Sequence, residues 1–215
     1  LTLNKIILSN GNADKGAGVY VEDGASLIVN SVKFINNTAV TRGGAIYSEG
    51  NVAVNKAIFD GNDVTFRSKN VDNGGAAIYA LGGKLTVVDS NFTNNLKDYV
   101  VRGTDDKIGD LINAIITTSA VAEITGSRFV NNSGFYGGAI YADKNSNVTI
   151  IDSDFKNNKA SINGGAIFVN GGATVSIIAQ NKDVTFSGNK AGKKSNSIYL
   201  NTYEDETGVY NAILN

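Results

Sequence analysis

Two aspartates, Asp152 and Asp154, are the best candidates for catalytic chemistry in this sequence. A β-strand places residues i and i+2 on one face, so their carboxylates would lie close together, with Arg128 and Lys156 near them. Glycoside hydrolases use such a carboxylate pair as acid and base. Polysaccharide lyases use clustered carboxylates with Ca²⁺ and a basic residue. A solvated strand face explains the same residues, and we favour that interpretation.

A second candidate site is the stretch LKDYVVRGTDDKIGDL, residues 96–111, which carries an aromatic residue, an arginine and several acids. The residues we single out there are Tyr99, Arg102, Asp105, Asp106 and Asp110. The aspartates could bind a cation, although ordinary loop solubility explains them equally well. A basic cluster, NKAGKKSN (residues 189–196), is interpreted as a solvated turn rather than a polyanion site.

The residue types that are absent exclude several chemistries. The 215 residues include no histidine and no cysteine, which excludes the usual zinc sites, a Ser-His-Asp triad and a thiol nucleophile. With 19 basic and 20 acidic residues, the net charge of −1 indicates neither nucleic acid nor an anionic membrane as a partner. No apolar run approaches the roughly 18 residues of a membrane-spanning helix. We therefore expect no enzyme activity, no cofactor and no membrane insertion of this chain.

An internal repeat supplies the elements that must position these residues. The isoleucine slot of the motif GGAIY falls at Val19, Ile46, Ile78, Ile115, Ile140, Ile167 and Ile198. An aromatic slot falls at Ile7 (a degenerate first member), Phe34, Phe66, Phe92, Phe129, Phe155 and Phe186. Three residues later come Asn10, Asn37, Lys69, Asn95, Asn132, Asn158 and Asn189. Phe59 with Asn62 offers a rival register, which we reject because it breaks the usual 12-residue separation of the two slots.

The repeat predicts a solenoid. Each unit holds three short strand-like pieces separated by Gly, Asn and Asp turn residues. A β-sandwich would have similar turn spacing but does not require identical residues at fixed slots. In a solenoid each slot stacks on its equivalent one rung away, about 4.8 Å distant. We predict an all-β, right-handed, single-stranded parallel β-helix of about six or seven rungs over residues 1–200, with 96–111 as an insertion. Residues 201–215 would form a tail, a continuation or a cap.

Strand periodicity assigns faces to the repeated residues. We place the isoleucine slot inside and the next residue, mostly tyrosine, in a ladder on the outer face. The asparagines should form a structural spine, since Asn tolerates left-handed backbone and its amide both donates and accepts. The glycines supply positive φ or relieve crowding, and the sequence leaves both open. The turns between the asparagine slot and GGAIY look too short to form a concave surface.

The motifs resemble a known family. They read GAGVY (16–20), GGAIY (43–47), GGAAIY (74–79), GGAIY (137–141) and GGAIF (164–168), with partners FINN, FTNN, FVNN, FKNN and FSGN. This GGAI and F-x-x-N pairing is similar to the repeat of chlamydial polymorphic membrane proteins and to other autotransporter passengers and β-helical surface adhesins. The resemblance implies export, display at the cell surface or outer membrane, adhesion and a part in virulence.

The resemblance leads to an expected function and two alternatives. We expect an extracellular segment of a longer surface-displayed adhesin that binds a protein or glycan of a host or neighbouring cell. One alternative is a carbohydrate-active β-helix enzyme or glycan-binding module. The other is a structural stalk or filament subunit that self-associates through the solenoid ends. Recognition residues concentrate on loops held by rigid scaffolds, so we expect any receptor contact in residues 96–111.

Overall fold

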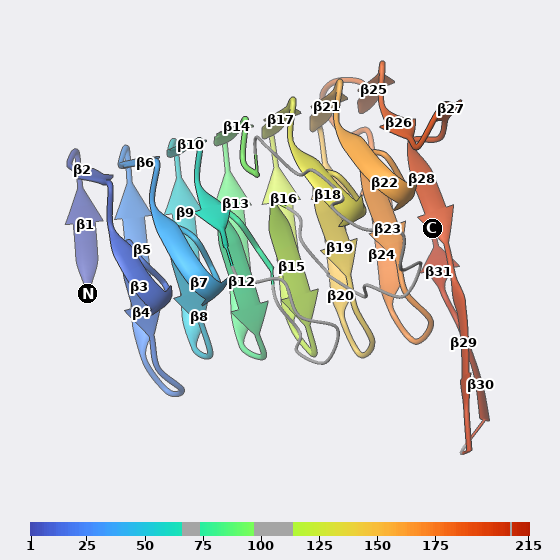
Figure 1. Cartoon of the computed structure of the whole chain (residues 1–215), viewed down its shortest axis with the longest axis horizontal. Helices are drawn as coiled ribbons and strands as arrows, with labels where there is room; N and C mark the ends of the chain where they lie inside the picture. Colours follow the sequence, from blue (N-terminus) through green and yellow to red (C-terminus); the bar gives the residue numbers. More distant parts are fainter. Residues whose placement is uncertain (66–73, 97–113, 207) are drawn as a thin grey trace.

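The computed structural model describes residues 1–65, 74–96, 114–206 and 208–215. Its described residues form strands and turns, without helix, and most strands pair in parallel with the equivalent strand of the next repeat. Figure 1 shows these layers following one another from the N-terminal to the C-terminal end of the long axis. Within these ranges no helix is long and apolar enough to cross a membrane. The prediction of an all-β parallel β-helix is confirmed.

Three parallel sheets, here called walls, enclose the core. The described strands of the middle wall are β1 (Thr2–Asn4), β5 (Ser26–Asn30), β9 (Asn51–Asn55), β13 (Lys84–Val88), β16 (Val121–Thr125), β20 (Asn147–Ile151), β24 (Thr174–Ile178) and β31 (Ile213–Leu214). Those of the aromatic wall are β2 (Ile7–Ser9), β6 (Lys33–Ile35), β10 (Ile58–Asp60), β14 (Asn91–Thr93), β17 (Arg128–Val130), β21 (Asp154–Lys156) and β25 (Thr185–Ser187). Those of the isoleucine wall are β4 (Val19–Val21), β8 (Ile46–Ser48), β12 (Ile78–Leu81), β15 (Ile115–Thr118), β19 (Ile140–Ala142), β23 (Ile167–Val169) and β28 (Ile198–Leu200).

The aromatic wall carries a stack of phenylalanines through the core. The rings of Phe34, Phe59, Phe92, Phe129, Phe155 and Phe186 follow one another with centroids 4.6–4.9 Å apart and nearly parallel planes. Phe59 pairs with Phe34 and Phe92, so our assignment of Phe66 to this slot is wrong. Leu8, not Ile7, pairs with Phe34. In both units the slot is occupied by the residue whose ring or methyl groups face the core.

The isoleucine slot is confirmed in every unit. Cα pairing runs without a shift from Val19 through Ile46 and onward to Ile198. The tyrosine ladder lies outside the main core, as predicted, but most of it is buried rather than exposed. Tyr47, Tyr79, Ile116, Tyr141 and Phe168 form a second apolar cluster and are each at most 4% exposed. The predicted solvent-facing ladder is therefore wrong in its exposure.

A fourth wall, which our three-strand unit omitted, helps to cover that ladder. Its described strands are β3 (Asn12–Lys15), β7 (Thr38–Arg42) and β11 (Asp63–Val64) in one sheet, and β18 (Ser133–Tyr136), β22 (Lys159–Asn163), β26 (Lys190–Ala191) and β27 (Lys194–Ser195) in another. Tyr136 packs on Phe168 with centroids 4.8 Å apart, and Lys15 and Arg42 lie over Tyr47 and Tyr79. The presumed short turn between the asparagine slot and the glycines is thus a strand in several units.

The glycine pair meets both requirements that the sequence left open. The first glycine has positive φ, for example +65° at Gly43. At the second glycine the next rung comes too close for a side chain, since a Cβ on Gly44 would lie 2.1 Å from the carbonyl oxygen of Ala76. Positive φ and close approach therefore act on neighbouring residues of the same corner.

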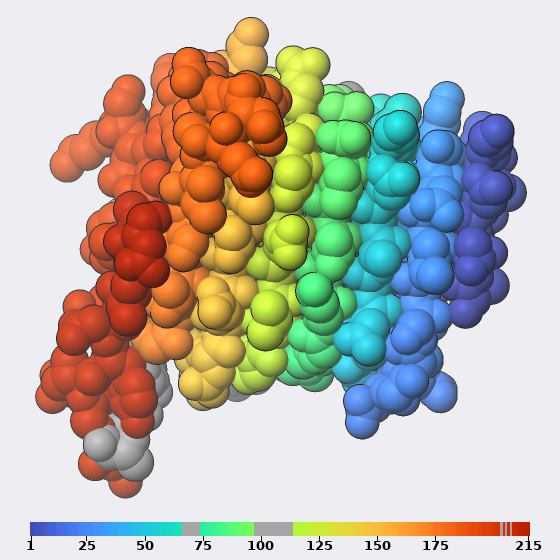
Figure 2. Space-filling view, turned by 180° about the vertical axis from the view of Figure 1, so that it is seen from behind, coloured from blue at the N-terminus to red at the C-terminus, as the bar shows by residue number. Residues whose placement is uncertain are grey.

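The C-terminal residues add a hairpin and a last strand. Strands β29 (Thr202–Asp205) and β30 (Gly208–Asn211) pair antiparallel and project from the end of the solenoid (Figures 1 and 2). After them β31 returns to pair in parallel with β24 of the middle wall. The chain thus continues the solenoid once more after the hairpin.

Candidate functional site

The scaffold beneath any site on this protein is a buried asparagine spine. Its members Asn37, Asn62, Asn95, Asn132, Asn158 and Asn189 are at most 3% exposed. The Oδ1 atom of Asn132 accepts the backbone N–H and the Nδ2–H of Asn95, at 3.1 and 3.0 Å. Its Nδ2 donates to the carbonyl oxygen of Phe92 and to Oδ1 of Asn158, at 2.9 and 3.0 Å. Buried amides that are fully bonded in this way lock adjacent rungs in register.

The two asparagines of the FxNN motif have different roles. The first one, such as Asn131, is exposed and has left-handed backbone, with φ of 57°. The second, such as Asn132, points inward and belongs to the spine. Gly61 and Gly188 replace the first asparagine in their units, also with positive φ. Our sequence interpretation gave both properties to one residue.

The ends of the spine differ from its middle. Gly11, not Asn10, donates its backbone N–H to Oδ1 of Asn37, so our placement of Asn10 in the spine is wrong. Asn62 fills the slot that we gave to Lys69, which lies outside the described residues. At the other end Nδ2 of Asn189 donates to the hydroxyl oxygen of Ser197 at 3.3 Å.

The predicted carboxylate pair, Asp152 and Asp154, does not form a shared acid–base site. Asp152 lies in a corner with φ of 50°, before β21 begins, and only Asp154 belongs to the strand. The carboxylate of Asp152 accepts the backbone N–H groups of Gln180, Asn181 and Lys182 and the side-chain amide of Asn181. These donors, the Asn181 N–H first, lower the pKa of Asp152 to about 2.

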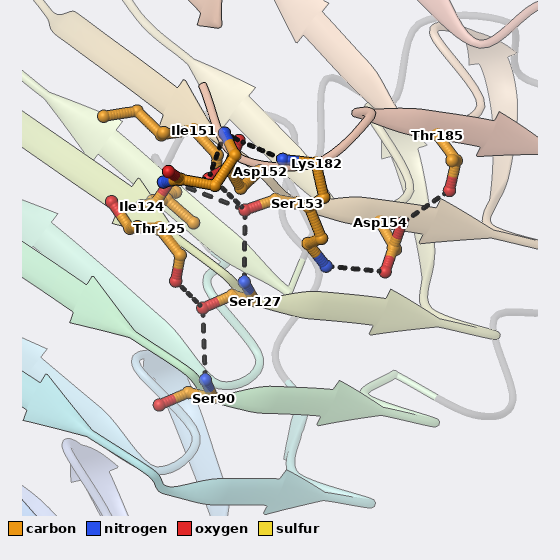
Figure 3. A network of polar contacts seen from close by, with 11 residues as sticks. Ser90, Ile124, Thr125, Ser127, Ile151, Asp152, Ser153, Asp154, Lys182 and Thr185 are labelled. Carbon is orange, nitrogen blue, oxygen red and sulfur yellow. Dashed lines mark hydrogen bonds and ion pairs between the residues drawn. The ribbon is translucent and has the colours of Figure 1, made fainter. Parts of the chain in front are cut away.

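Asp154 is engaged in the same way (Figure 3). Its carboxylate accepts the hydroxyl of Thr185 at 2.6 Å and pairs with the ammonium of Lys182 at 3.1 Å. Partial burial opposes the charged form, but the bonds from Thr185 and Lys182 outweigh it and lower the pKa of Asp154. Arg128 is its Cα neighbour on the adjacent strand, as predicted. Both carboxylates anchor the segment between β24 and β25, and neither is placed to serve as a raised-pKa acid.

A serine ladder continues this network along the same corner (Figure 3). The hydroxyl oxygens of Ser153 and Ser127 accept the backbone N–H of Ser127 and Ser90, respectively, each at 3.2 Å. Each hydroxyl also donates within its own rung, from Ser153 to Ile151 and from Ser127 to Thr125. These bonds satisfy the serine hydroxyls and the backbone N–H groups of the corner, which therefore has a structural role.

The predicted binding residues Tyr99, Arg102, Asp105, Asp106 and Asp110 lie outside the described residues. The structure does fix the points from which their segment departs and to which it returns. The backbone N–H of Leu96 donates to the carbonyl oxygen of Asn62 at 2.9 Å. The carbonyl oxygen of Ala114 accepts the N–H of Ala77 at 3.0 Å. Both ends are therefore tied by hydrogen bonds to the neighbouring rung, one after β14 and the other directly before β15.

A groove of about 520 Å³ hollows the C-terminal half of the fourth wall. Its lining includes Ser133, Gly134, Lys159, Ala160, Ser161 and Lys190. Our expectation that this side offers no concave surface is therefore wrong. The signal that could have found it is the strand-like alternation of KASIN at residues 159–163. The described ranges contain no cluster of three or more acidic side chains able to hold a metal ion.

The fold and the spine define a passenger-like parallel β-helix, and comparison with known proteins agrees. A sequence profile of the Chlamydia polymorphic membrane protein repeat matches residues 31–49 and 152–170, each running from an aromatic slot through GGAI. The protein named Probable autotransporter YfaL, from Escherichia coli (strain K12), is 28% identical over 165 residues. That alignment covers 73% of this chain and 13% of the relative, so the chain spans a small part of that protein's length. No solved structure matches. The resemblance to polymorphic membrane proteins and autotransporter passengers is confirmed.

Proposed function

We propose that the chain is part of a surface-displayed passenger and acts as a non-enzymatic adhesin. Its similarity to polymorphic membrane protein repeats and to an autotransporter supports display at the cell surface. The engagement of Asp152 and Asp154 in structural hydrogen bonds supports binding rather than catalysis. The partner would be a protein or glycan of a host or neighbouring cell.

One observation carries the choice of binding segment. The spine passes the insertion without a break, since Asn95 bonds to Asn132 with the same distances as Asn132 to Asn158. The phenylalanine stack is likewise continuous from Phe92 to Phe129, with centroids 4.8 Å apart. The spine and the phenylalanine stack are therefore continuous across this unit without any contribution from residues 97–113, which supports a role of that segment in binding.

The composition of the insertion suits recognition. Tyrosine and arginine are enriched among residues that dominate binding energy, and Tyr99 and Arg102 are close together in the sequence. Asp105, Asp106 and Asp110 would add charge complementarity to a partner with basic groups. Loops on rigid scaffolds lose little entropy at their anchor points when they bind, because those points are already fixed.

The test is to replace residues 97–110 by the short fourth-wall segment Ser133–Tyr136, copied from the next unit, and to measure binding to cultured cells and to a glycan array. A matched control shortens residues 66–73, which lie between β11 and Gly74 in the sequence. We expect both variants to keep the β-rich circular dichroism spectrum and thermal unfolding midpoint, and only the first to lose binding. Retained binding by the folded 97–110 variant would place the site elsewhere.

A further inference from the structure

We propose that the groove in the fourth wall is a second binding site, whose ligand is an anionic polysaccharide carrying sulfate or carboxylate groups. This site is formed by residues outside the segment 97–113 and goes beyond the proposed function. It is built by β18, β22 and β26, which lie side by side near the C-terminal end (Figure 1).

The charge of the groove is its first distinguishing feature. Lys159 and Lys190 are direct Cα partners on adjacent parallel strands, so two like charges face solvent one rung apart. Like charges in this relation destabilise a sheet. In the part of the chain that the structure describes, neither ammonium has a carboxylate partner. Lys194, on β27, adds a third positive charge beside Ala191. A bound anion would remove the repulsion.

The other half of the fourth wall shows that this charge pattern is particular to the groove. Strands β3, β7 and β11 mix both signs, with Asp14 and Asp63 among Lys15 and Arg42. Strands β22, β26 and β27 each contain a lysine, β18 is uncharged, and none of the four contains an acidic residue. The net charge of the whole chain is −1, so a polyanion would be attracted by this local row and not by the protein as a whole.

The shape and lining of the groove fit a sugar. Gly134 and Ala160 are buried Cα partners that form a floor of small residues, and Gly192 leaves the next position open. Ser133 and Ser161 place hydroxyls beside the lysines, where they can donate to sulfate or carboxylate oxygens and accept from sugar hydroxyls. The volume of about 520 Å³ is within the range of ligand sites, about 300–1,000 Å³. The lining residues that the structure describes include no aromatic ring, which disfavours stacking of nucleic-acid bases.

The test measures binding of the chain to immobilised heparin and to polygalacturonate by surface plasmon resonance, with neutral dextran and a single-stranded oligonucleotide as further probes. The groove variant is Lys159→Gln/Lys190→Gln. The matched control is Lys33→Gln/Lys144→Gln, which removes the same charge from exposed lysines elsewhere. We expect the wild type to bind at least one of the two polyanions and not dextran. The groove variant should bind that polyanion at least about tenfold more weakly. The slope of its log affinity against log salt concentration should be smaller in magnitude, corresponding to about two fewer ionic contacts.

Thermal unfolding separates a lost site from a lost fold, since removing the like-charged pair should leave the midpoint unchanged or higher. The chain shortened at residues 97–110 should bind the polyanion as the wild type does, so this inference and the proposed function can fail separately. An equal loss in the control variant, or no wild-type binding to either polyanion, would overturn the proposal. Oligonucleotide binding as tight as that of the polysaccharides, through the same lysines, would overturn the assignment to a glycan.

Discussion

Replacing Asn132 by alanine should destabilise the protein far more than any change at its neighbour Asn131. Asn132 is fully buried in the spine, whereas Asn131 is exposed and serves only as a left-handed corner. The two residues are adjacent and identical in type, so the pair isolates the role of the spine from the composition of the motif.

The magnitude follows from the bonds that Asn132→Ala removes. The backbone N–H of Asn95 and one hydrogen of its Nδ2 lose their acceptor. The carbonyl oxygen of Phe92 loses a donor as well. A buried polar group left without a partner costs about 1–3 kcal/mol, so two orphaned donors give a loss of roughly 2–6 kcal/mol. Asn131→Gly should change stability by less than about 0.5 kcal/mol, because glycine adopts positive φ without strain.

The assay is urea unfolding followed by far-ultraviolet circular dichroism, with the midpoint and the slope compared for wild type and both variants. A drop in the midpoint for Asn132→Ala with an unchanged slope is the expected result. If Asn132→Ala were no more destabilising than Asn131→Gly, the spine would not be what holds the rungs in register.

Three further predictions test other parts of the structure. Phe129→Ala should cost about 3–5 kcal/mol in urea unfolding, since its fully buried ring stacks between two others and its removal leaves a cavity; a cost near zero would contradict the stack. The pKa of Asp152 lies below its ordinary 3.8, at about 2, so its carboxylate stabilises the fold fully above about pH 4 and loses this effect as the pH falls towards 2. Urea midpoints measured across that range should therefore fall more steeply for wild type than for Asp152→Asn, and parallel curves would refute the anchoring role. Gly44→Ala should destabilise more than Gly24→Ala in thermal unfolding, because a Cβ on Gly44 meets backbone atoms of the next rung, whereas a Cβ on Gly24 meets no atom within 4 Å and costs only the strain of its positive φ.

The isoleucine slot could be predicted in full because two independent constraints meet there. In five units a glycine with positive φ lies three residues before the slot and fixes the corner (Gly16, Gly43, Gly75, Gly137 and Gly164), and in all units the aliphatic residue must then enter the core. No other GGAI-like motif competes within a unit. The aromatic slot was harder, since Phe66 satisfied the regular spacing while Phe59 satisfied the chemistry. Asn62 had to reach its buried partners in the spine, and hydrogen bonds constrain pairing more tightly than loop length does.

The exposure of the tyrosine ladder could not be predicted from strand alternation. Alternation correctly places Tyr141 on the face opposite Ile140, and both side chains are nevertheless buried. Burial of Tyr141 depends on stacking with Phe168, which Tyr136 of the fourth wall covers in turn. Such covering depends on the path of a neighbouring segment, which the local pattern around Tyr141 does not encode.

The candidate sites also depend on structural features that the local sequence pattern does not encode. The spacing of Asp152 and Asp154 suggested a catalytic pair, but the left-handed corner at Asp152 breaks the strand alternation on which that suggestion depended. The sequence favours a solvated turn over a polyanion site for NKAGKKSN (189–196), because Lys159 is 31 residues from Lys190 and becomes its neighbour only through rung stacking. Such pairs can be found in the sequence only when the register of every rung is known.

The most direct test of the central claim, that the insertion contacts the receptor, is site-specific photo-crosslinking on intact cells. The photoreactive residue p-benzoylphenylalanine would replace Tyr99 in one variant and Val121, which is 52% exposed on the middle wall, in another. This leaves the insertion and the scaffold in place, so loss of folding does not confuse the result. We predict a crosslinked species of defined mass with the residue at position 99 and none with the residue at position 121. A crosslink from position 121 with none from position 99 would contradict the account.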